Sequence, residues 1–215
     1  MHIIFDFDGT LADSFECMIK QFAKLSVELS LGAFQETQGV QLKDFSSREL
    51  IKHFNIPLYK IPTIIKRIRA HMQHEILSIP PFMGMPEAIK KLSASGFSLG
   101  ILTSNSRDNV TRWLAHNQLD TLFQFVRVES SFFSKKKGLK NILKRYNTRP
   151  VDAIYIGDET RDIEAALANE MRVLAVTWGY ASESVLAQCG PTRIIRNPSE
   201  ILQYLNVVAG EAVTS

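Results

Sequence analysis

Short apolar segments that alternate with helical patterns constrain the fold of this chain most strongly. Each segment is rich in Ile, Val, Leu or Phe and is bounded by polar or glycine positions, which is typical of strands buried in a parallel sheet. The segments are His2–Phe5, Ser98–Leu102, Phe123–Val128, Ala153–Ile156 and Val173–Val176. Helical patterns lie between the later segments. Alternation of this kind predicts an α/β fold with a parallel sheet covered on both faces.

The segment from Phe15 to Phe82 differs, because it contains no convincing strand. Apolar residues recur there at helical spacing, in one long stripe and two shorter patterns. The stripe consists of Ile61, Ile64, Ile65, Ile68, Met72 and Ile76, and the shorter patterns consist of Phe22, Leu25, Val27 and Leu29 and of Leu50, Ile51 and Phe54. Pro80 and Pro81 mark the return to the main domain. We therefore expect an all-helical insert at residues 15–82 and a main domain formed by residues 1–14 and 83–215.

The net charge and the composition argue against binding to nucleic acid or to a membrane. The chain has 215 residues, of which 25 are Lys or Arg and 22 are Asp or Glu, with a net charge of +3. This excess is too small to indicate binding to nucleic acid or to a membrane surface. No apolar run approaches the ~18 residues of a membrane span, and the N-terminal residues do not resemble a signal peptide. Two cysteines, Cys17 and Cys189, are far apart and are expected to be reduced thiols. We expect a cytoplasmic protein.

The first candidate site follows the first strand, in the sequence Asp6-Phe7-Asp8-Gly9. In an extended backbone, residues i and i+2 point the same way, so Asp6 and Asp8 would lie near each other at the carboxyl end of the strand. Ligands of open α/β sheets bind at that edge. A hard divalent cation would offset the repulsion between the two carboxylates. The alternative is an ordinary Asp-Gly turn.

A second candidate site follows the next strand and contains Thr103, Ser104 and Asn105. Hydroxyl groups and backbone N–H groups at the start of a helix can bind an anion. The alternative is a simple helix cap, for which Asn105 or Ser106 would serve.

Lysines at positions 135 to 137 form the third candidate. A lysine run is usually a solvated face, but Lys135 lies four residues before Leu139, on the inward face of the following helix. Its ammonium group could bind a phosphoryl oxygen and keep a carboxylate ionised. Lys136 is the alternative.

The fourth candidate is Gly157-Asp158-Glu159-Thr160-Arg161-Asp162, after another buried strand. Taken alone, Asp158 or Thr160 could be only a helix cap. Four such sites at the ends of successive strands would, however, meet at one edge of one sheet. That edge would hold several carboxylates, a lysine and a hydroxyl group around a cation.

These motifs, above all DFDGTLADS and GDETRD, resemble those of the haloacid dehalogenase superfamily, in its phosphoglycolate-phosphatase-like branch. All four signature motifs occur in order from Asp6 to Asp162. The resemblance implies a three-layer, Rossmann-like core with a five-stranded parallel sheet and an inserted helical cap. It also implies that the cap closes over the site, with hinges near Ala12–Ser14 and Phe82–Met85.

The resemblance further implies a role for each acidic position. Asp6 would be the nucleophile that forms an aspartyl-phosphate, and Asp8 would be the general acid and base. Mg²⁺ would be held by the side chains of Asp6 and Asp158 and by the backbone carbonyl of Asp8. Asp162 and Gly9 would support this arrangement.

The same resemblance implies which residues bind the phosphoryl group of the substrate. Thr103 would bind it together with the backbone at Ser104 and Asn105, and Lys135 would neutralise its charge. Many relatives have a proline after this lysine, whereas here Lys136 follows it.

The activity implied is a magnesium-dependent phosphatase that acts on a small phosphorylated metabolite, as a monomer or homodimer. The alternatives are a sugar phosphomutase and a catalytically inactive scaffold that binds a ligand or a partner protein. Because the insert has an excess of basic residues, Lys43 and Arg48 are candidates for substrate binding, although either could be an ordinary solvated charge. Lys66, Arg67 and Arg69 lie opposite the isoleucine stripe and are expected to face solvent.

Overall fold

A six-stranded parallel sheet forms the centre of the protein. The computed structural model describes residues 1–28, 42–129 and 134–211. The strand order is β3-β2-β1-β4-β5-β6, and every neighbouring pair is parallel. The strands are β1 (His2–Phe5), β2 (Ser98–Thr103), β3 (Phe123–Val128), β4 (Ala153–Gly157), β5 (Arg172–Val176) and β6 (Arg193–Ile195).

The α/β fold class is as predicted, but the sheet has six strands and not five. The missed strand, β6, is an edge strand of three residues, Arg193–Ile195. Only two of its residues are apolar and Arg193 is exposed, so it lacks the apolar run by which the other strands are recognised.

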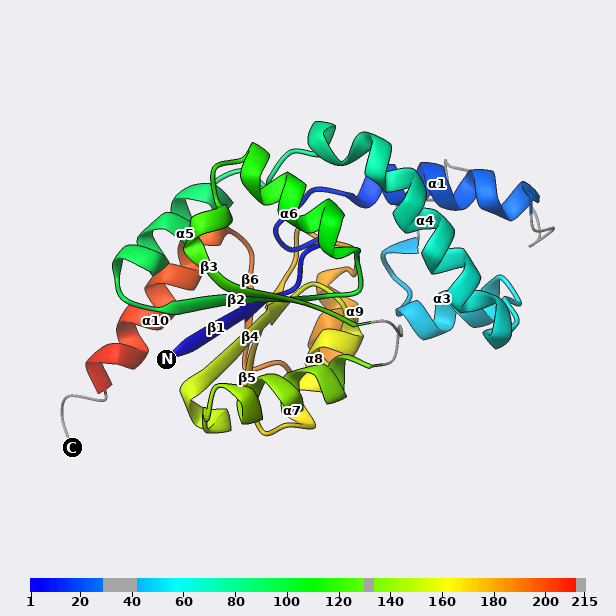
Figure 1. The fold of residues 1–215 in the computed structure, drawn as a ribbon. Coiled ribbons are helices and arrows are strands. Elements are labelled where there is room, and N and C mark those ends of the chain that lie inside the picture. Colours follow the sequence, from blue (N-terminus) through cyan, green and yellow to red (C-terminus); the bar gives the residue numbers. More distant parts are fainter. Residues whose placement is uncertain (29–41, 130–133, 212–215) are drawn as a thin grey trace.

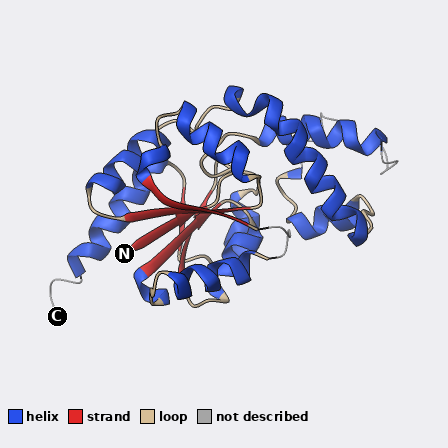
Figure 2. Cartoon of the chain, in the orientation of Figure 1, coloured by secondary structure: helices blue, strands red, loops and turns tan. Residues whose placement is uncertain are grey.

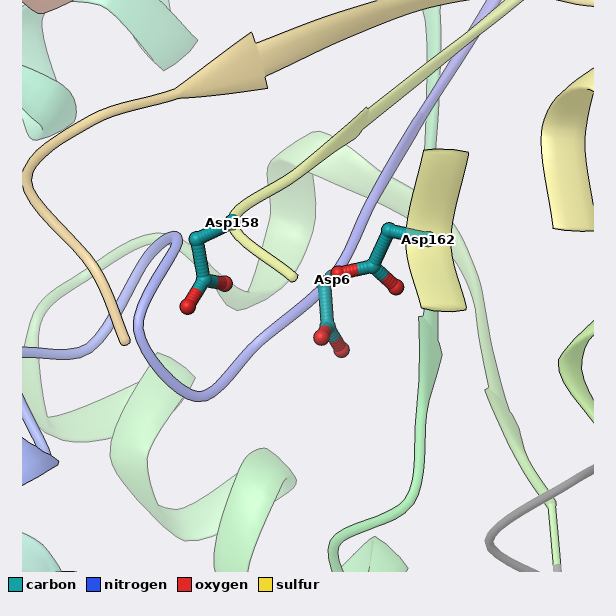
Figure 3. Close-up of side chains that lie close together, drawn as sticks. All are labelled: Asp6, Asp158 and Asp162. Atoms are coloured by element: carbon teal, nitrogen blue, oxygen red, sulfur yellow. The ribbon is translucent and has the colours of Figure 1, made fainter. Parts of the chain in front are cut away.

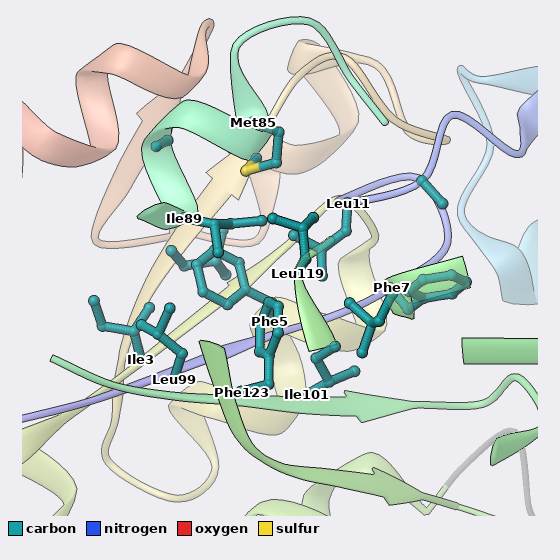
Figure 4. Close-up of a cluster of buried hydrophobic side chains, with 14 of the residues drawn as sticks. Ile3, Phe5, Phe7, Leu11, Met85, Ile89, Leu99, Ile101, Leu119 and Phe123 are labelled. Atoms are coloured by element: carbon teal, nitrogen blue, oxygen red, sulfur yellow. The ribbon is translucent and has the colours of Figure 1, made fainter. Parts of the chain in front are cut away.

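Helices cover both faces of the sheet (Figures 1 and 2). Successive side chains of β1 point to opposite faces, so Ile3 and Phe5 enter one core cluster and Ile4 enters the other. The first cluster contains buried residues of α5 (Met85–Ala94), α6 (Arg107–His116) and α10 (Pro198–Glu211), and Figure 4 shows part of it. The second contains those of α7 (Lys135–Arg145), α8 (Thr160–Leu167) and α9 (Glu183–Gln188).

The segment between β1 and β2 is helical and contains no strand in the part that the structure describes. Its helices lie beyond one end of the sheet, to the right in Figure 1. They are α1 (Phe15–Glu28), α3 (Ser47–His53) and α4 (Ile61–Glu75), with short 3-10 helices η2 (Leu58–Lys60) and η3 (Ile76–Ser78). Two further 3-10 helices, η4 (Asp120–Leu122) and η5 (Pro150–Asp152), lie in the core. Leu29 lies outside the described residues. We refer to residues 15–82 as the cap, and its exact boundaries stay a prediction.

The cap leaves and re-enters the core at one place. Ala12 and Pro81 form an antiparallel bridge. The backbone N–H of Asp13 donates to the carbonyl of Pro80 at 2.9 Å, and that of Phe82 donates to the carbonyl of Leu11 at 3.2 Å. The two connections therefore run side by side.

Among the described helices, none combines the length and the apolar character needed to cross a lipid bilayer.

Candidate active site

The candidate site is built at the carboxyl ends of the central strands. Because β1 lies between β2 and β4, the loops that follow these three strands are neighbours. Asp6 follows β1, Thr103 ends β2 and Asp158 follows β4. These residues are 2%, 1% and 0% exposed, so the polar groups of this edge are largely withdrawn from water.

A buried lysine joins two of the carboxylates. The Nζ atom of Lys135 lies 2.5 Å from Oδ2 of Asp6 and also donates to Oδ1 of Asp162. Burial lowers the pKa of Lys135, but the carboxylates of Asp162 and Asp6 outweigh this effect, and the pKa is raised above its ordinary value. Lys136 is exposed. Of the two alternatives from the sequence, Lys135 is the lysine that reaches the carboxylates.

Asp158 is held from two sides. The hydroxyl of Thr10 donates to its Oδ1 at 2.6 Å, and the backbone N–H of Tyr180 donates to its Oδ2 at 2.8 Å. Gly9 has a positive φ of 77°, and a Cβ atom there would lie 2.1 Å from Oδ2 of Asp158. Glycine is therefore required at position 9 both for the turn and for the close approach of the carboxylate.

Three buried carboxylates could hold a metal ion. Asp6, Asp158 and Asp162 each offer an oxygen atom within 4.8 Å of the others, and their side chains converge in Figure 3. Burial raises the pKa of Asp6 to about 7. It also raises that of Asp158 well above its usual range, with further contributions from the charges of Asp6 and Asp162. A divalent cation would relieve this repulsion, so the donor set fits Mg²⁺.

Asp8 has different partners from Asp6. Its carboxylate accepts hydrogen bonds from Nδ2 of Asn105, at 3.1 and 3.0 Å, and from Oγ of Ser14 at 3.1 Å. Burial raises the pKa of Asp8, while the hydrogen bonds from Asn105 and Ser14 partly oppose that shift. Phe7, between the two acids, points into the core and contacts Trp113 edge to face. Asp6 and Asp8 thus share one edge of the sheet but join separate hydrogen-bond networks.

The loop after β2 orders Asn105 for this contact. Its backbone N–H donates to Oγ1 of Thr103 at 2.9 Å, and its Oδ1 accepts from the N–H of Ser106 and from Nδ2 of Asn109. Ser106 is the N-cap of α6, because its hydroxyl accepts from the N–H of Asn109. Because Ser106 caps the helix, the side chain of Asn105 is available to hold the carboxylate of Asp8.

Comparison with known proteins identifies the family. The family model for haloacid dehalogenase-like hydrolases matches residues 3–176. The chain belongs to this family. It is 30% identical to a phosphoglycolate phosphatase of Synechococcus elongatus over 94% of this chain and 95% of that relative. It is 28% identical to the pyrophosphatase PpaX of Listeria welshimeri, over 93% and 94% of the two chains.

Solved structures of this family have the same fold. A predicted phosphatase from Clostridium acetobutylicum superposes with a TM-score of 0.81 at 22% identity, over 95% of this chain and 97% of the other. A haloacid dehalogenase-like hydrolase from Streptococcus pneumoniae does so with a TM-score of 0.77 at 22% identity and the same coverage. The predicted family, the α/β fold class and the assignment to the phosphatase-type hydrolases are confirmed.

Several site residues of this hydrolase were not predicted. Thr10 and Ser14 lie inside the first motif and hold Asp158 and Asp8. Tyr180 follows β5, so the same strand-end argument would have found it. The hydroxyl of Tyr155 donates to Asp162 from within β4, and no sequence signal distinguishes it from other buried strand residues.

The cap residues singled out from the sequence lie elsewhere than expected. Arg48 is exposed and pairs with Glu164 of the core at 2.9 Å. The Nζ of Lys43 lies 4.6 Å from the ring centroid of Phe15. A cavity lies between the cap and the core and is lined by Asp8 and by side chains of the cap. Neither Lys43 nor Arg48 lines it, whereas Arg69 does. The prediction that Arg69 faces solvent is wrong. Arg69 lies four residues after Ile65 and three before Met72, so it borders the apolar face of α4, and it donates to the carbonyl of Glu129 at 3.4 Å.

Proposed function

We propose that this hydrolase is a magnesium-dependent phosphatase that cleaves a small phosphomonoester through an aspartyl-phosphate on Asp6. The observation that carries the proposal is the buried ion pair between Asp6 and Lys135 at the sheet edge, with Asp8 held separately beside it. An ionised carboxylate is a nucleophile, and a second carboxyl group on a different hydrogen-bond network can carry the proton.

In the first step, a carboxylate oxygen of Asp6 attacks phosphorus, and the bond from phosphorus to the ester oxygen breaks. The carboxyl group of Asp8 donates its proton to that departing oxygen, which leaves as an alcohol. The raised pKa of Asp8 favours the protonated form needed here. The bonds from Asn105 and Ser14 then stabilise the carboxylate that remains.

In the second step, Asp8 takes a proton from water, and the resulting hydroxide attacks the phosphorus of the aspartyl-phosphate. The bond to Asp6 breaks, inorganic phosphate leaves and the carboxylate is restored. Splitting hydrolysis into two transfers is the usual advantage of covalent catalysis.

Charge on the phosphoryl oxygens is offset by groups around Asp6. Lys135 has three N–H donors, of which two are directed at Asp6 and Asp162, so one remains for a phosphoryl oxygen. Thr103, which ends β2, and Ser104, which follows it, would complete this site. Mg²⁺, which Asp6 and Asp158 would hold, supplies positive charge that stabilises the transferring phosphoryl group.

The proposal is tested by release of phosphate from an aryl phosphate, with Mg²⁺ and with a chelator. We expect metal-dependent turnover that falls on the order of 10⁴-fold or more in Asp6→Asn, because the nucleophile is lost. Asp13→Asn, an exposed carboxylate in the same loop, is the matched control and should keep its activity. Full activity in Asp6→Asn would rule out the assigned nucleophile.

Two further readouts separate the alternatives. An acid-quenched sample should carry phosphate on the peptide that contains Asp6. Isomerisation of a hexose phosphate without net phosphate release would instead indicate a phosphomutase, and inactivity toward every phosphomonoester would indicate a scaffold.

A further inference from the structure

A cavity of about 220 Å³ opens beside the candidate site, between the cap and the core. Asp8, Ser104 and Asn105 line one end of it. Asp8 is the group that would protonate the departing oxygen. The leaving group of a bound phosphomonoester would therefore extend into this cavity.

Beyond Asp8 the lining becomes apolar. The walls are formed by side chains of α1, α3 and α4 and by Phe54, which caps α3. They include Phe22, Leu50, Ile64, Ile65 and Ile68. Leu50, Ile65 and Ile68 are only half-buried, although they are large and apolar. Their partly accessible surface borders the cavity, so an apolar ligand could cover it.

Among the described residues of the lining, Asp8, Arg69, Glu159, Arg161 and Tyr180 are the ionisable ones, and the other cap residues are mainly apolar. Glu159 and Arg161 are paired with each other. Arg69 donates to the backbone carbonyl of Glu129 at 3.4 Å and contacts the core. A charged group placed among the isoleucines, away from Arg69, would lose its hydration without gaining a partner there, which is unfavourable.

We propose that this hydrolase prefers phosphomonoesters whose leaving group is an apolar alcohol, with an alkyl or aryl group that occupies the apolar part of the cavity. This inference rests on the proposed phosphatase function and specifies its substrate class. The reaction is unchanged: the bond from phosphorus to the ester oxygen breaks, the alcohol takes the proton from Asp8, and water supplies the last oxygen of the phosphate. A leaving group with its own carboxylate, as in phosphoglycolate, suits the apolar part of this cavity poorly.

A series of n-alkyl phosphates from methyl to hexyl tests the proposal with the full chain and Mg²⁺. Each methylene buried against apolar walls should raise kcat/KM about fourfold, until the cavity is full. Equal values along the series would overturn the inference while leaving the phosphatase function intact. If no ester of the series and no aryl phosphate released phosphate, the phosphatase function itself would fail.

A pair of variants locates the effect. Leu50→Gln places an amide in the cavity wall, and Leu58→Gln makes the same change at a position of the cap that is 68% exposed and does not line the cavity. The readout is the ratio of kcat/KM for hexyl phosphate to that for methyl phosphate, which does not depend on the fraction of folded enzyme. We expect the ratio to fall several-fold in Leu50→Gln and to stay unchanged in Leu58→Gln.

A charge placed in the wall gives an independent check. Ile65→Arg should raise the ratio of kcat/KM for phosphoglycolate to that for ethyl phosphate, because the guanidinium group can pair with the carboxylate of the substrate. If Leu50→Gln and Ile65→Arg both kept wild-type ratios, the cavity would not hold the leaving group and the proposal would be wrong.

Discussion

The core and the cap of this hydrolase are built on different principles. At the sheet edge of the core, buried charged groups hold one another in place: Lys135 is shared by Asp6 and Asp162, and Asp158 is fixed by Thr10 and Tyr180. In the cap, the wall that faces the site is mainly apolar and many of its side chains are only half-buried. Directional hydrogen bonds fix atoms for one reaction, whereas an apolar wall accepts any group of suitable shape. We infer that the core determines the chemistry and the cap determines the substrate.

The strongest test of these separate roles is Asp8→Asn, which removes the proposed proton carrier of the core and preserves the shape of its side chain. We expect kcat to fall about 10²–10⁴-fold, since an amide cannot act as a general acid or base. The effect should be similar for methyl and hexyl phosphates, because the group acts on the ester oxygen common to both. Steady-state phosphate release measures it, and a loss confined to hexyl phosphate would contradict these separate roles.

The buried charges should also matter for stability. Lys135→Met leaves Asp6 and Asp162 without their shared cation and should lower the free energy of unfolding by about 3–5 kcal/mol. Urea denaturation with a chelator present measures this without a metal ion that could replace the ammonium group. The exposed neighbour supplies the control: Lys136→Met should change the value by less than about 0.5 kcal/mol. Equal effects in the two variants would show that the ion pair is not what stabilises this edge.

A matched pair of truncations compares the packing of the two regions. Leu102 is 0% exposed in the second core cluster, and Leu102→Ala should destabilise the protein by about 2–5 kcal/mol through the cavity it leaves. Leu50 is only half-buried in the cap, so Leu50→Ala should cost about 1 kcal/mol. Thermal or urea unfolding measures both. A larger loss for Leu50 would mean that the cap is packed as tightly as the core.

The smallest effect on stability is expected at an exposed ion pair that joins the cap to the core. Arg48 in the cap and Glu164 in the core lie 2.9 Å apart, with side chains that are 67% and 43% exposed. Solvent screens such a pair, so Arg48→Ala should change the free energy of unfolding by about 0.2–1 kcal/mol. Added salt should reduce the difference between variant and wild type. A larger, salt-independent loss would identify this contact as a fixed link between cap and core.

The sequence predicted most of the core because two simple rules apply there. Buried parallel strands are short apolar runs, and the residues after them meet at one edge, which located Asp6, Thr103 and Asp158. These rules could not predict β6, because it has too few apolar residues. They could not identify Tyr155 as a site residue either, because it lies within a strand and not after one. In the cap, the helical pattern showed which face of α4 is apolar, but not that Arg69, at the edge of that face, contacts the core. Arg69 was misplaced for that reason.

The bridge between Ala12 and Pro81 has a consequence for how this chain could diversify. The 68 residues between Ala12 and Pro81 begin and end side by side, so they leave the core and return to it at one point. Lengthening, shortening or exchanging such an excursion changes the loop-closure entropy only slowly. The helices of the insert can thus be replaced as a cassette, with the catalytic edge inherited unaltered, so that new specificities arise without the chemistry having to evolve again.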